Sequence, residues 1–305
     1  MRRVCIAGAG AIGSLFAGHL ARVAEVVVFT RREEQARALE EQGLRISGRA
    51  DFTARVAATA DPAALPDADL AIVACKGTDL ESLAERLEGR LAGATVMTVQ
   101  NGLGAEEVVA AHGDWPLLSS VTFMSGTRHG DAHVEYVLDT ETWIGPHRGT
   151  TEADARRVAE LIVSSGLKAQ AFADLRPAQW SKLIFNATVN GVAALTELPH
   201  DPHFADTDTL SGLGHLVRDL VDEGKAVATA AGVELHDDPW EMNVLATQRG
   251  YRHYPSMLED VEARRPTELE LINGALVREA RRYGVAAPLQ TAVYRLVKAK
   301  EASYS

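Results

Sequence analysis

One stretch near the N-terminus decides the fold of the first half of the chain: Val4-Cys5-Ile6-Ala7-Gly8-Ala9-Gly10-Ala11-Ile12-Gly13. Its first four residues are apolar and predict a buried strand, and a helical pattern begins directly after the first two glycines. Each glycine has a separate use: Gly8 allows a tight turn, Gly10 lets the main chain approach a pyrophosphate, and Gly13 lets the helix pack closely on the strand. The helix N-terminus adds N–H groups and a positive dipole that favour an anion.

The residues that follow complete this unit. A second apolar run, Glu25–Phe29, predicts a second strand. Glycine-rich turns alone are weak indicators, but here strand, glycines, helix and second strand arrive in order within about thirty residues, as a dinucleotide-binding unit requires. The predicted cofactor-binding residues of this loop are Gly8, Ala9, Gly10, Ala11, Ile12 and Gly13.

The end of the second strand indicates which nicotinamide cofactor binds. An NAD site places an acid there to accept from the ribose 2′-hydroxyl, whereas this chain has Thr30-Arg31-Arg32. A guanidinium makes bidentate, charge-assisted hydrogen bonds with a 2′-phosphate. The alternative is a solvated arginine that opens a helix and pairs with Glu33 or Glu34. We favour the first interpretation, which makes Arg31 a cofactor ligand and NADP(H) the cofactor.

The rest of the first half alternates between short apolar runs and helical patterns. The predicted strands cover residues 4–7, 25–29, 70–75 and 95–99, and the predicted helices cover 12–23, 33–42, 78–91 and 105–112. Such alternation predicts a parallel sheet with helices on both faces. Weaker patterns at 117–123, 133–136 and 142–145 are interpreted as later strands of the same sheet.

The pattern changes after Phe172 and is almost wholly helical from Pro177 onward. The predicted helices cover residues 178–195, 207–231, 257–264, 267–283 and 288–300. Proline-containing breaks at 198–202 and at Pro239 separate them. We therefore predict an α/β protein of two domains. A Rossmann-type, doubly wound NADP-binding domain covers 1–174, and an all-helical substrate-binding and catalytic domain covers 175–305.

Length and composition agree with two soluble domains. A chain of 305 residues is too long for one typical core, and 46% hydrophobic with 24% charged residues is an ordinary globular composition. The formal net charge of -11 disfavours nucleic acid and anionic membranes as partners. Cys5 and Cys75 fall in strand-like runs, and buried reduced thiols are favoured over a disulfide or a metal pair.

The most informative stretch of the second half is WSKLIFNATVN, from Trp180 to Asn190. Lys182, Asn186 and Asn190 are spaced four residues apart, so they share one face of the predicted helix. The residues between them are mostly apolar, which indicates a largely buried helix. A lysine and two asparagines there are costly unless each finds a polar partner. The alternatives to an active site are a surface stripe and a buried structural network.

A later segment supplies a candidate partner for that lysine. Pro266-Thr267-Glu268 precedes the apolar positions 269, 272 and 276, so Glu268 is predicted in the first turn of the helix over 267–283. An acid in a first turn is ordinarily a charge favoured by the helix dipole. Glu268 therefore has a structural interpretation beside the functional one.

These motifs, taken in order, resemble the ketopantoate reductase family. They are the GAGAIG loop, Lys76 after a strand, Gln100-Asn101-Gly102 after the next strand, the WSKLIFNATVN helix, Ser256-Met257-Leu258-Glu259-Asp260, and Arg265-Pro266-Thr267-Glu268 leading into Ile272-Asn273-Gly274. The match spans nearly the whole chain. The lysine–asparagine helix with the SMLED and PTE segments is much more specific than the glycine loop.

The resemblance implies roles for individual residues. Lys182 matches the general acid that protonates the C2 carbonyl oxygen while NADPH delivers hydride to that carbon. The implied substrate ligands are Asn101, at the boundary with the nicotinamide, Asn186, Asn190 and Ser256, the serine lying near the substrate carboxylate. The implied cofactor contacts are Arg31 at the 2′-phosphate, Lys76, Asn101, Gly126, and Glu268 beside the catalytic lysine.

The implied activity is NADPH-dependent reduction of 2-dehydropantoate (ketopantoate) to (R)-pantoate, on the route to pantothenate and coenzyme A. An ammonium group near the keto oxygen stabilises the developing negative charge and donates the proton. Burial lowers a lysine pKa and a neighbouring Glu268 raises it, and the sequence leaves that balance open. Two alternatives stay open: a reductase of another branched 2-keto acid, and a catalytically idle NADPH-binding sensor.

Two features depart from the family pattern and leave the substrate open. His200 stands in a Pro-His-Asp loop where family members can place another asparagine, and as a lone loop histidine it is expected to be solvated. Residues 134–139 lack the glycine-rich pattern expected before Trp143. Other site types have no support: the histidines show no zinc-protease spacing, and neither a GxSxG elbow nor a phosphate-binding GxxxxGK loop occurs.

Location and assembly complete the expectations. Met1-Arg2-Arg3 before an apolar run resembles a signal peptide, but the glycines at 8, 10 and 13 break the apolar stretch that one needs. No run approaches about 18 apolar residues, so a cytoplasmic location is predicted. The active site is expected between the domains. Long amphipathic helices in the second half are compatible with a homodimer.

Overall fold

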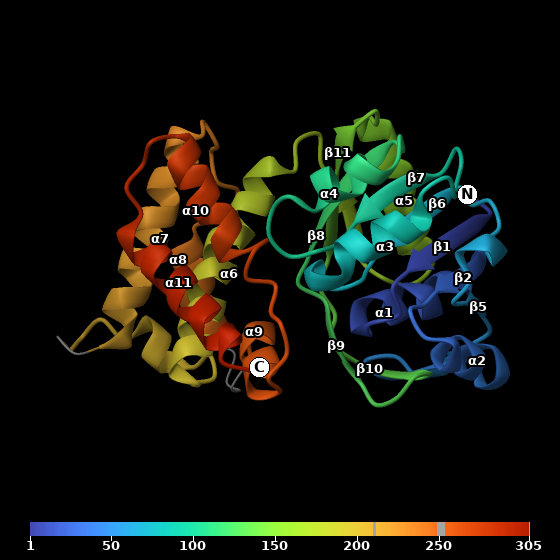
Figure 1. Ribbon diagram of the computed structural model, residues 1–305, viewed down its shortest axis with the longest axis horizontal. Coiled ribbons are helices and arrows are strands. Elements are labelled where there is room, and N and C mark those ends of the chain that lie inside the picture. The colour runs from blue at the N-terminus through green and yellow to red at the C-terminus, as the bar shows by residue number, and fades with distance from the viewer. Residues whose placement is uncertain (210–211, 249–253, 305) are drawn as a thin grey trace. The chain divides into compact units, whose positions relative to one another are not determined.

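The structure is a computed structural model that describes residues 1–209, 212–248 and 254–304 (Figure 1). The chain divides into two units, one comprising Met1–Gln100 and Ala105–Leu175, the other Asn101–Gly104 and Arg176–Ser305. The first unit holds the strands and the second is helical, so the expected fold class is confirmed. The loop Asn101–Gly104 belongs to the helical unit although it lies far from it in the sequence.

The first unit is built on an eight-stranded sheet of order β12-β11-β8-β7-β6-β1-β2-β5. Its strands are β1 (Arg3–Ala7), β2 (Glu25–Phe29), β5 (Ala57–Thr59), β6 (Leu70–Val73), β7 (Thr95–Thr98), β8 (Leu117–Thr122), β11 (Thr142–Arg148) and β12 (Ala169–Ala171). All neighbours pair in parallel except β8 and β11. The chain winds outward from β1 in one direction and from β6 in the other. In such sheets ligands bind at the carboxyl ends of the strands, where the winding reverses.

A second sheet, of order β4-β3-β10-β9, corrects one prediction. It consists of β3 (Leu44–Gly48), β4 (Phe52–Ala54), β9 (Ser125–Arg128) and β10 (His133–Leu138). Residues 133–136 were expected in the main sheet but lie in β10, whereas 117–123 and 142–145 do join the main sheet as β8 and β11. The second sheet packs on α1 (Ala11–Leu20), where Ile46, Val134 and Tyr136 are buried. Its strands are buried on one face only, so their residues alternate between buried and partly exposed.

Helices cover the main sheet, and all but one of them bury a single face; α1 contacts both sheets and is buried at every position from 13 to 20. Besides α1 they are α2 (Glu33–Gln42), α3 (Leu80–Leu87), α4 (Ala105–His112) and α5 (Glu152–Ser164), with short 3₁₀ turns at η1 (Pro62–Ala64) and η2 (Gly77–Asp79). In α3 the buried residues are Leu80, Leu83, Ala84 and Leu87, which is helical spacing. A capping box between Thr151 and Asp154 starts α5.

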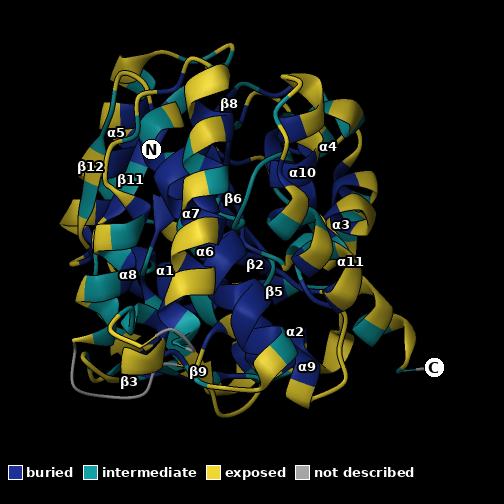
Figure 2. Ribbon diagram, turned by 90° about the vertical axis from the view of Figure 1, so that its left-hand side faces the viewer, coloured by how far each residue is buried: buried dark blue, intermediate teal, exposed yellow. Residues whose placement is uncertain are grey.

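The second unit is organised around α6 (Arg176–Thr196), which contacts every other α-helix of that unit. These are α7 (Leu213–Ala230), α8 (Pro239–Thr247), α9 (Ser256–Glu262), α10 (Asn273–Arg282) and α11 (Pro288–Ala302), with a 3₁₀ turn at η3 (Pro202–Ala205). Most of α6 is buried, whereas α7 has an exposed face (Figure 2). The two helices approach closely at Gly224, where a Cβ would lie 2.6 Å from Ile184.

Three helix predictions in this unit differ from the structure. The helix predicted over 207–231 begins at Leu213, and residues 210–211 of that prediction lie outside the described residues. The helix predicted over 267–283 begins at Asn273. Pro239, expected as a break, is instead the first residue of α8, where its missing N–H has no intrahelical partner to lose. Asp238 caps this helix by accepting from the N–H of Trp240 at 2.8 Å.

Two remaining expectations concern the cysteines and the membrane. Cys5 and Cys75 are both free thiols. Cys5 is fully buried, and burial raises the pKa of its thiol to about 12, so it is an inert core residue. Among the described helices, none combines the length and the apolar character that a membrane span requires.

Candidate active site

The glycine loop joins β1 to α1 at the carboxyl edge of the main sheet. Gly8 has a φ of +109°, and a Cβ there would lie 2.5 Å from the backbone nitrogen of Cys75 on the neighbouring strand connection. A Cβ on Gly13 would lie 1.9 Å from the carbonyl oxygen of Gly8. These two glycines are therefore required by the protein's own packing.

Gly10 differs from the other two glycines. Its φ is −73°, which any residue can adopt, and a Cβ would meet nothing closer than the Ala74 carbonyl oxygen at 3.8 Å. The fold itself thus leaves room for a side chain at this position. The loop and the start of α1 are partly exposed, so the geometry fits a bound pyrophosphate, with Gly10 as the point of close approach.

A buried glutamine holds this loop and was not predicted. The side-chain amide of Gln35 donates to the carbonyl oxygen of Ala9 at 2.9 Å. Gln35 lies with Ala36 and Leu39 on the buried face of α2. A polar residue in that apolar stripe was the signal that could have identified it.

The arginines after β2 have carboxylate partners other than those considered from the sequence. Arg31 forms an ion pair with Asp79, with 3.0 Å between Nη1 and Oδ1, and 73% of its side chain is exposed. Arg32 pairs with Asp131. Lys76 is exposed and lies between β6 and η2. Strand β6 pairs in parallel with β1. Both Arg31 and Lys76 therefore follow strands that flank β1, on the edge of the sheet that carries the glycine loop.

Gly126, a predicted cofactor contact, lies in β9 of the second sheet. A Cβ there would lie 2.8 Å from the Glu135 carbonyl oxygen and 3.1 Å from the side chain of Leu15 in α1. The missing side chain is thus explained by packing between β9, β10 and α1.

The lysine and the two asparagines of α6 share one helix face and are buried. Lys182 is 9% exposed, Asn186 8% and Asn190 5%. Burial lowers the pKa of Lys182 to about 8, and the carboxylate of Glu268 opposes that shift. Desolvation therefore outweighs the acidic neighbour, which answers the question left open by the sequence. The lysine can give up its proton near neutral pH, as a general acid must.

Glu268 is placed differently from its prediction. It lies in the turn that precedes α10, not in the first turn of that helix, and its carbonyl oxygen accepts from the N–H groups of Leu271 and Ile272. Its carboxylate Oε2 accepts from Nδ2 of Asn101 at 3.1 Å. The predicted residues Asn101, Lys182 and Glu268 are thus brought together within the helical unit.

The loop that carries Asn101 is fixed to the turn that carries Glu268. The N–H of Leu103 donates to the Leu271 carbonyl oxygen at 2.9 Å. Gly102 has a φ of +96°, and a Cβ would lie 1.8 Å from that same oxygen. Only glycine permits this approach, which explains why residue 102 is a glycine. Gln100, just before it, donates to the carbonyl oxygens of Val73 and Cys75 at 3.0 Å.

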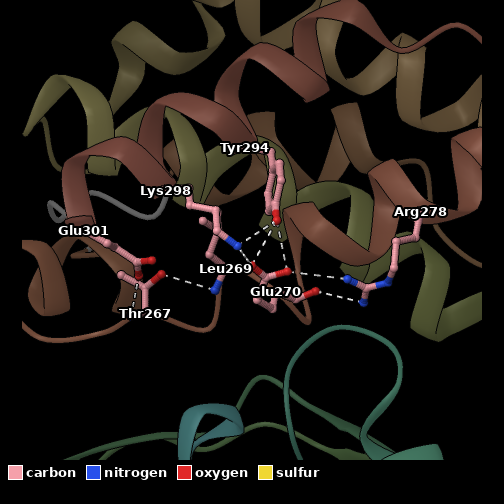
Figure 3. Close-up of polar contacts among 7 residues, drawn as sticks. All are labelled: Thr267, Leu269, Glu270, Arg278, Tyr294, Lys298 and Glu301. Carbon is pink, nitrogen blue, oxygen red and sulfur yellow. Dashed lines mark hydrogen bonds and ion pairs between the residues drawn. The ribbon is translucent and has the colours of Figure 1, made fainter.

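Helix α11 holds the turn around Glu268 on both sides (Figure 3). Before it, the N–H of Thr267 donates to Oε1 of Glu301 at 2.7 Å. After it, the Glu270 carboxylate accepts from the Tyr294 hydroxyl at 2.9 Å and pairs with Lys298. Positions 294, 298 and 301 form one face of α11, a spacing that could have identified this group of residues.

Ser256, a predicted substrate ligand, and His200, to which no role is assigned, both lie in the helical unit. Ser256 is the first residue of α9, which packs on α6, and its side chain is exposed. His200 was expected to be solvated, but this was wrong, because only 1% of it is exposed. Its Nε2 lies 2.9 Å from Oδ1 of Asn243, and its ring packs edge-on against Phe204. Asn243 also donates to the Phe204 carbonyl oxygen at 3.0 Å, so the histidine helps to hold η3 against α8.

Comparisons with known proteins agree with this geometry. The family model "Ketopantoate reductase PanE/ApbA" matches residues 4–149, and "Ketopantoate reductase PanE/ApbA C terminal" matches residues 174–301. The chain belongs to the ketopantoate reductase family. The resemblance inferred from the motifs is thereby confirmed.

Individual relatives cover the whole chain. The 2-dehydropantoate 2-reductase of Archaeoglobus fulgidus is 32% identical over 99% of this chain and 98% of that protein. That of Halobacterium salinarum is 32% identical over 97% and 98%. Among solved structures, a ketopantoate reductase from Ralstonia eutropha JMP134 has a TM-score of 0.89 at 28% identity, covering 99% of both chains. D-mandelate dehydrogenase with NADH and anilino(oxo)acetate also has a TM-score of 0.89, at 25% identity and the same coverage.

Proposed function

We propose that this ketopantoate reductase family member reduces 2-dehydropantoate to (R)-pantoate with NADPH, in the biosynthesis of pantothenate and coenzyme A. The observation that carries the proposal is the buried Lys182 beside Glu268, on the helix face that also holds Asn186 and Asn190. Two curated relatives of about the full length of the chain are named for this reaction. An idle NADPH sensor would have no use for this costly buried group.

The residues of the helical unit can account for the chemistry. When bound at the glycine loop, NADPH supplies the hydride that adds to C2 of the keto acid. The ammonium of Lys182 hydrogen-bonds the keto oxygen, stabilises the charge that develops there and transfers its proton to it. Glu268 keeps part of the lysine population protonated by raising its pKa. We assign Asn101, Asn186, Asn190 and Ser256 as substrate ligands. Their neutral side chains can orient the keto acid by hydrogen bonds without adding charge to the pocket.

We assign residues 8–13, Arg31, Lys76, Asn101, Gly126 and Glu268 to NADPH. Arg31 is the residue proposed to select the phosphorylated cofactor. Replacing Arg31 with alanine is expected to weaken NADPH binding more than NADH binding, because only NADPH carries the 2′-phosphate. Dissociation constants measured by cofactor fluorescence test this. Equal weakening of both cofactors would place recognition of the 2′-phosphate elsewhere.

The pH dependence of reduction follows from the lysine. A general acid acts in its protonated form, so kcat/KM is expected to fall as pH rises through about 8, the pKa of Lys182. Glu268→Gln removes the carboxylate that raises this pKa and is expected to move the fall in rate to lower pH. A pH–rate profile of both proteins measures the shift. Glu262→Gln, an exposed position of α9, serves as the charge-matched control and should leave the profile in place. An unshifted profile in Glu268→Gln would separate Glu268 from the lysine.

A second candidate is reduction of a different branched 2-keto acid, favoured by the full-length likeness to D-mandelate dehydrogenase. A panel of 2-keto acids, followed by NADPH absorbance with purified protein, decides between them. Turnover of ketopantoate at the highest kcat/KM supports the first proposal. Turnover of another acid without ketopantoate replaces it, and NADPH binding with no turnover of any acid supports the sensor.

Location and assembly stay predictions. The cytoplasm is proposed as the site of action, in keeping with a small keto acid substrate. A homodimer is proposed from the amphipathic helices of the second unit. Light scattering tests the second point against the mass of 32.8 kDa for one chain.

A further inference from the structure

The arginine proposed to bind the 2′-phosphate already has an acidic partner. Arg31 follows β2, and Asp79 ends the short helix η2 that follows β6. Because β2 and β6 both pair in parallel with β1, their carboxyl ends and the glycine loop lie on the same edge of the sheet. There Nη1 of Arg31 lies 3.0 Å from Oδ1 of Asp79, and 45% of the Asp79 side chain is exposed.

The carboxylate of Asp79 is not used to cap a helix. Asp79 stands immediately before α3, where an aspartate commonly accepts a hydrogen bond from the first backbone N–H groups. Here its side chain makes no such bond, and its own N–H donates to the Lys76 carbonyl oxygen at 2.9 Å. Neutralising the side chain therefore removes the ion pair with Arg31 without removing a cap from α3.

We propose that Asp79 is a determinant of cofactor specificity: its carboxylate competes with the 2′-phosphate of NADPH for the guanidinium of Arg31, and so reduces the preference for NADPH over NADH. The inference rests on the proposed role of Arg31. A phosphate monoester carries about −1.5 to −2 charges near neutral pH and binds a guanidinium through charge-assisted hydrogen bonds, but here the carboxylate of Asp79 already occupies Nη1 of Arg31. NADH presents an uncharged 2′-hydroxyl at this position, so its binding does not require the ion pair between Arg31 and Asp79 to open.

Neighbouring charges single out Asp79 among the nearby acids. Arg32 and Arg128 both pair with Asp131, the second at 3.2 Å, so two guanidinium groups offset that carboxylate. Asp79 instead contacts the guanidinium that the phosphate needs. Ion pairs between exposed side chains are weak, so the pair can open when NADPH binds. The expected effect is a change in preference and not exclusion of NADPH.

The test compares the affinities of Asp79→Asn and wild-type protein for NADPH and NADH by titration of the full chain. Asp79→Asn is expected to bind NADPH about two- to fivefold more tightly, the range set by an exposed ion pair. NADH affinity should not rise, so the ratio of the two dissociation constants shifts toward NADPH. Glu160→Gln removes one exposed charge from α5, which packs on β11 and β12 at the far side of the sheet, and should leave the ratio unchanged. An unchanged or reversed ratio in Asp79→Asn overturns the proposal.

A double variant separates competition for Arg31 from simple charge repulsion. In an Arg31→Ala background, Asp79→Asn should no longer improve NADPH binding if Asp79 acts through the arginine. An equal improvement in both backgrounds overturns the proposed competition. The cofactor assignment itself fails on a different result, namely that Arg31→Ala alone weakens NADPH and NADH equally. A different result refutes only the inference about Asp79: Arg31→Ala loses affinity for NADPH but not for NADH, while Asp79→Asn leaves the ratio of the two dissociation constants unchanged.

Discussion

Replacing Lys182 with alanine is expected to lower turnover of the keto acid by a factor of about 10² to 10⁴, the usual effect of losing a positioned general acid. The side chain is buried and its pKa is lowered to about 8, so no solvent group takes over its function at the same position. NADPH affinity should change little, because the glycine loop and Arg31 are in the other unit. Steady-state kinetics and a cofactor titration of the same preparation measure both effects.

The control for this variant is a second lysine on the surface. Lys168 forms an exposed ion pair with Asp139, and Lys168→Ala should keep wild-type turnover. Unfolding is not expected in Lys182→Ala, because Glu268 keeps its hydrogen bond from Asn101. Near-normal turnover in the folded variant would remove Lys182 from the mechanism.

The second large effect is expected at the glycine loop, where two glycines should respond differently to the same substitution. Gly13→Ala places a Cβ 1.9 Å from the Gly8 carbonyl oxygen, so α1 must move away from β1. Overpacking of this kind costs about 1–3 kcal/mol of folding free energy, and sometimes more. Thermal unfolding should show a lowered Tm, and NADPH binding should be lost together with the geometry of the loop.

Gly10→Ala is expected to weaken NADPH binding while leaving the stability of the fold nearly unchanged. Its Cβ finds the nearest protein atom at 3.8 Å, so the Tm should fall only slightly. The same methyl group stands where the pyrophosphate is proposed to approach, and NADPH affinity should fall roughly tenfold to a hundredfold. Gly130→Ala, where a Cβ would meet nothing within 4 Å, controls for the substitution itself. A Gly10→Ala protein that binds NADPH normally would contradict the proposed path of the cofactor across this loop.

Local sequence patterns were sufficient to predict a structural feature where all the residues that form it lie in one short segment. The glycine loop between β1 and α1 is such a segment, because turn, helix start and close packing are all set by residues 8–13. The face of α6 is another, because a spacing of four places Lys182, Asn186 and Asn190 together in any α-helix. Their burial follows from the apolar residues between them.

Local sequence patterns gave wrong predictions where the position of a residue depends on a partner far away in the chain. Residues 133–136 read as a strand, but which sheet they join is decided by β3, about ninety residues earlier, and by the apolar face of α1. Glu268 was placed in a helix because its neighbours have helical spacing. The turn there is instead held by Glu301 and by the contact of Gly102 with Leu271. His200 was expected in solvent because its burial between Phe204 and Asn243 leaves no trace in the loop sequence.

The amino-acid sequence by itself determined the class of fold, the glycine loop between β1 and α1, the lysine–asparagine helix and the family, because each depends on residues close together in the chain or on short motifs in a set order. Tertiary structure alone decided that burial outweighs Glu268 in setting the pKa of Lys182, that Asn101 bonds to Glu268, and that Arg31 pairs with Asp79. Each of these depends on desolvation or on a distance between residues far apart in the chain. Electrostatic energies change steeply with both quantities, and neither is encoded in local spacing.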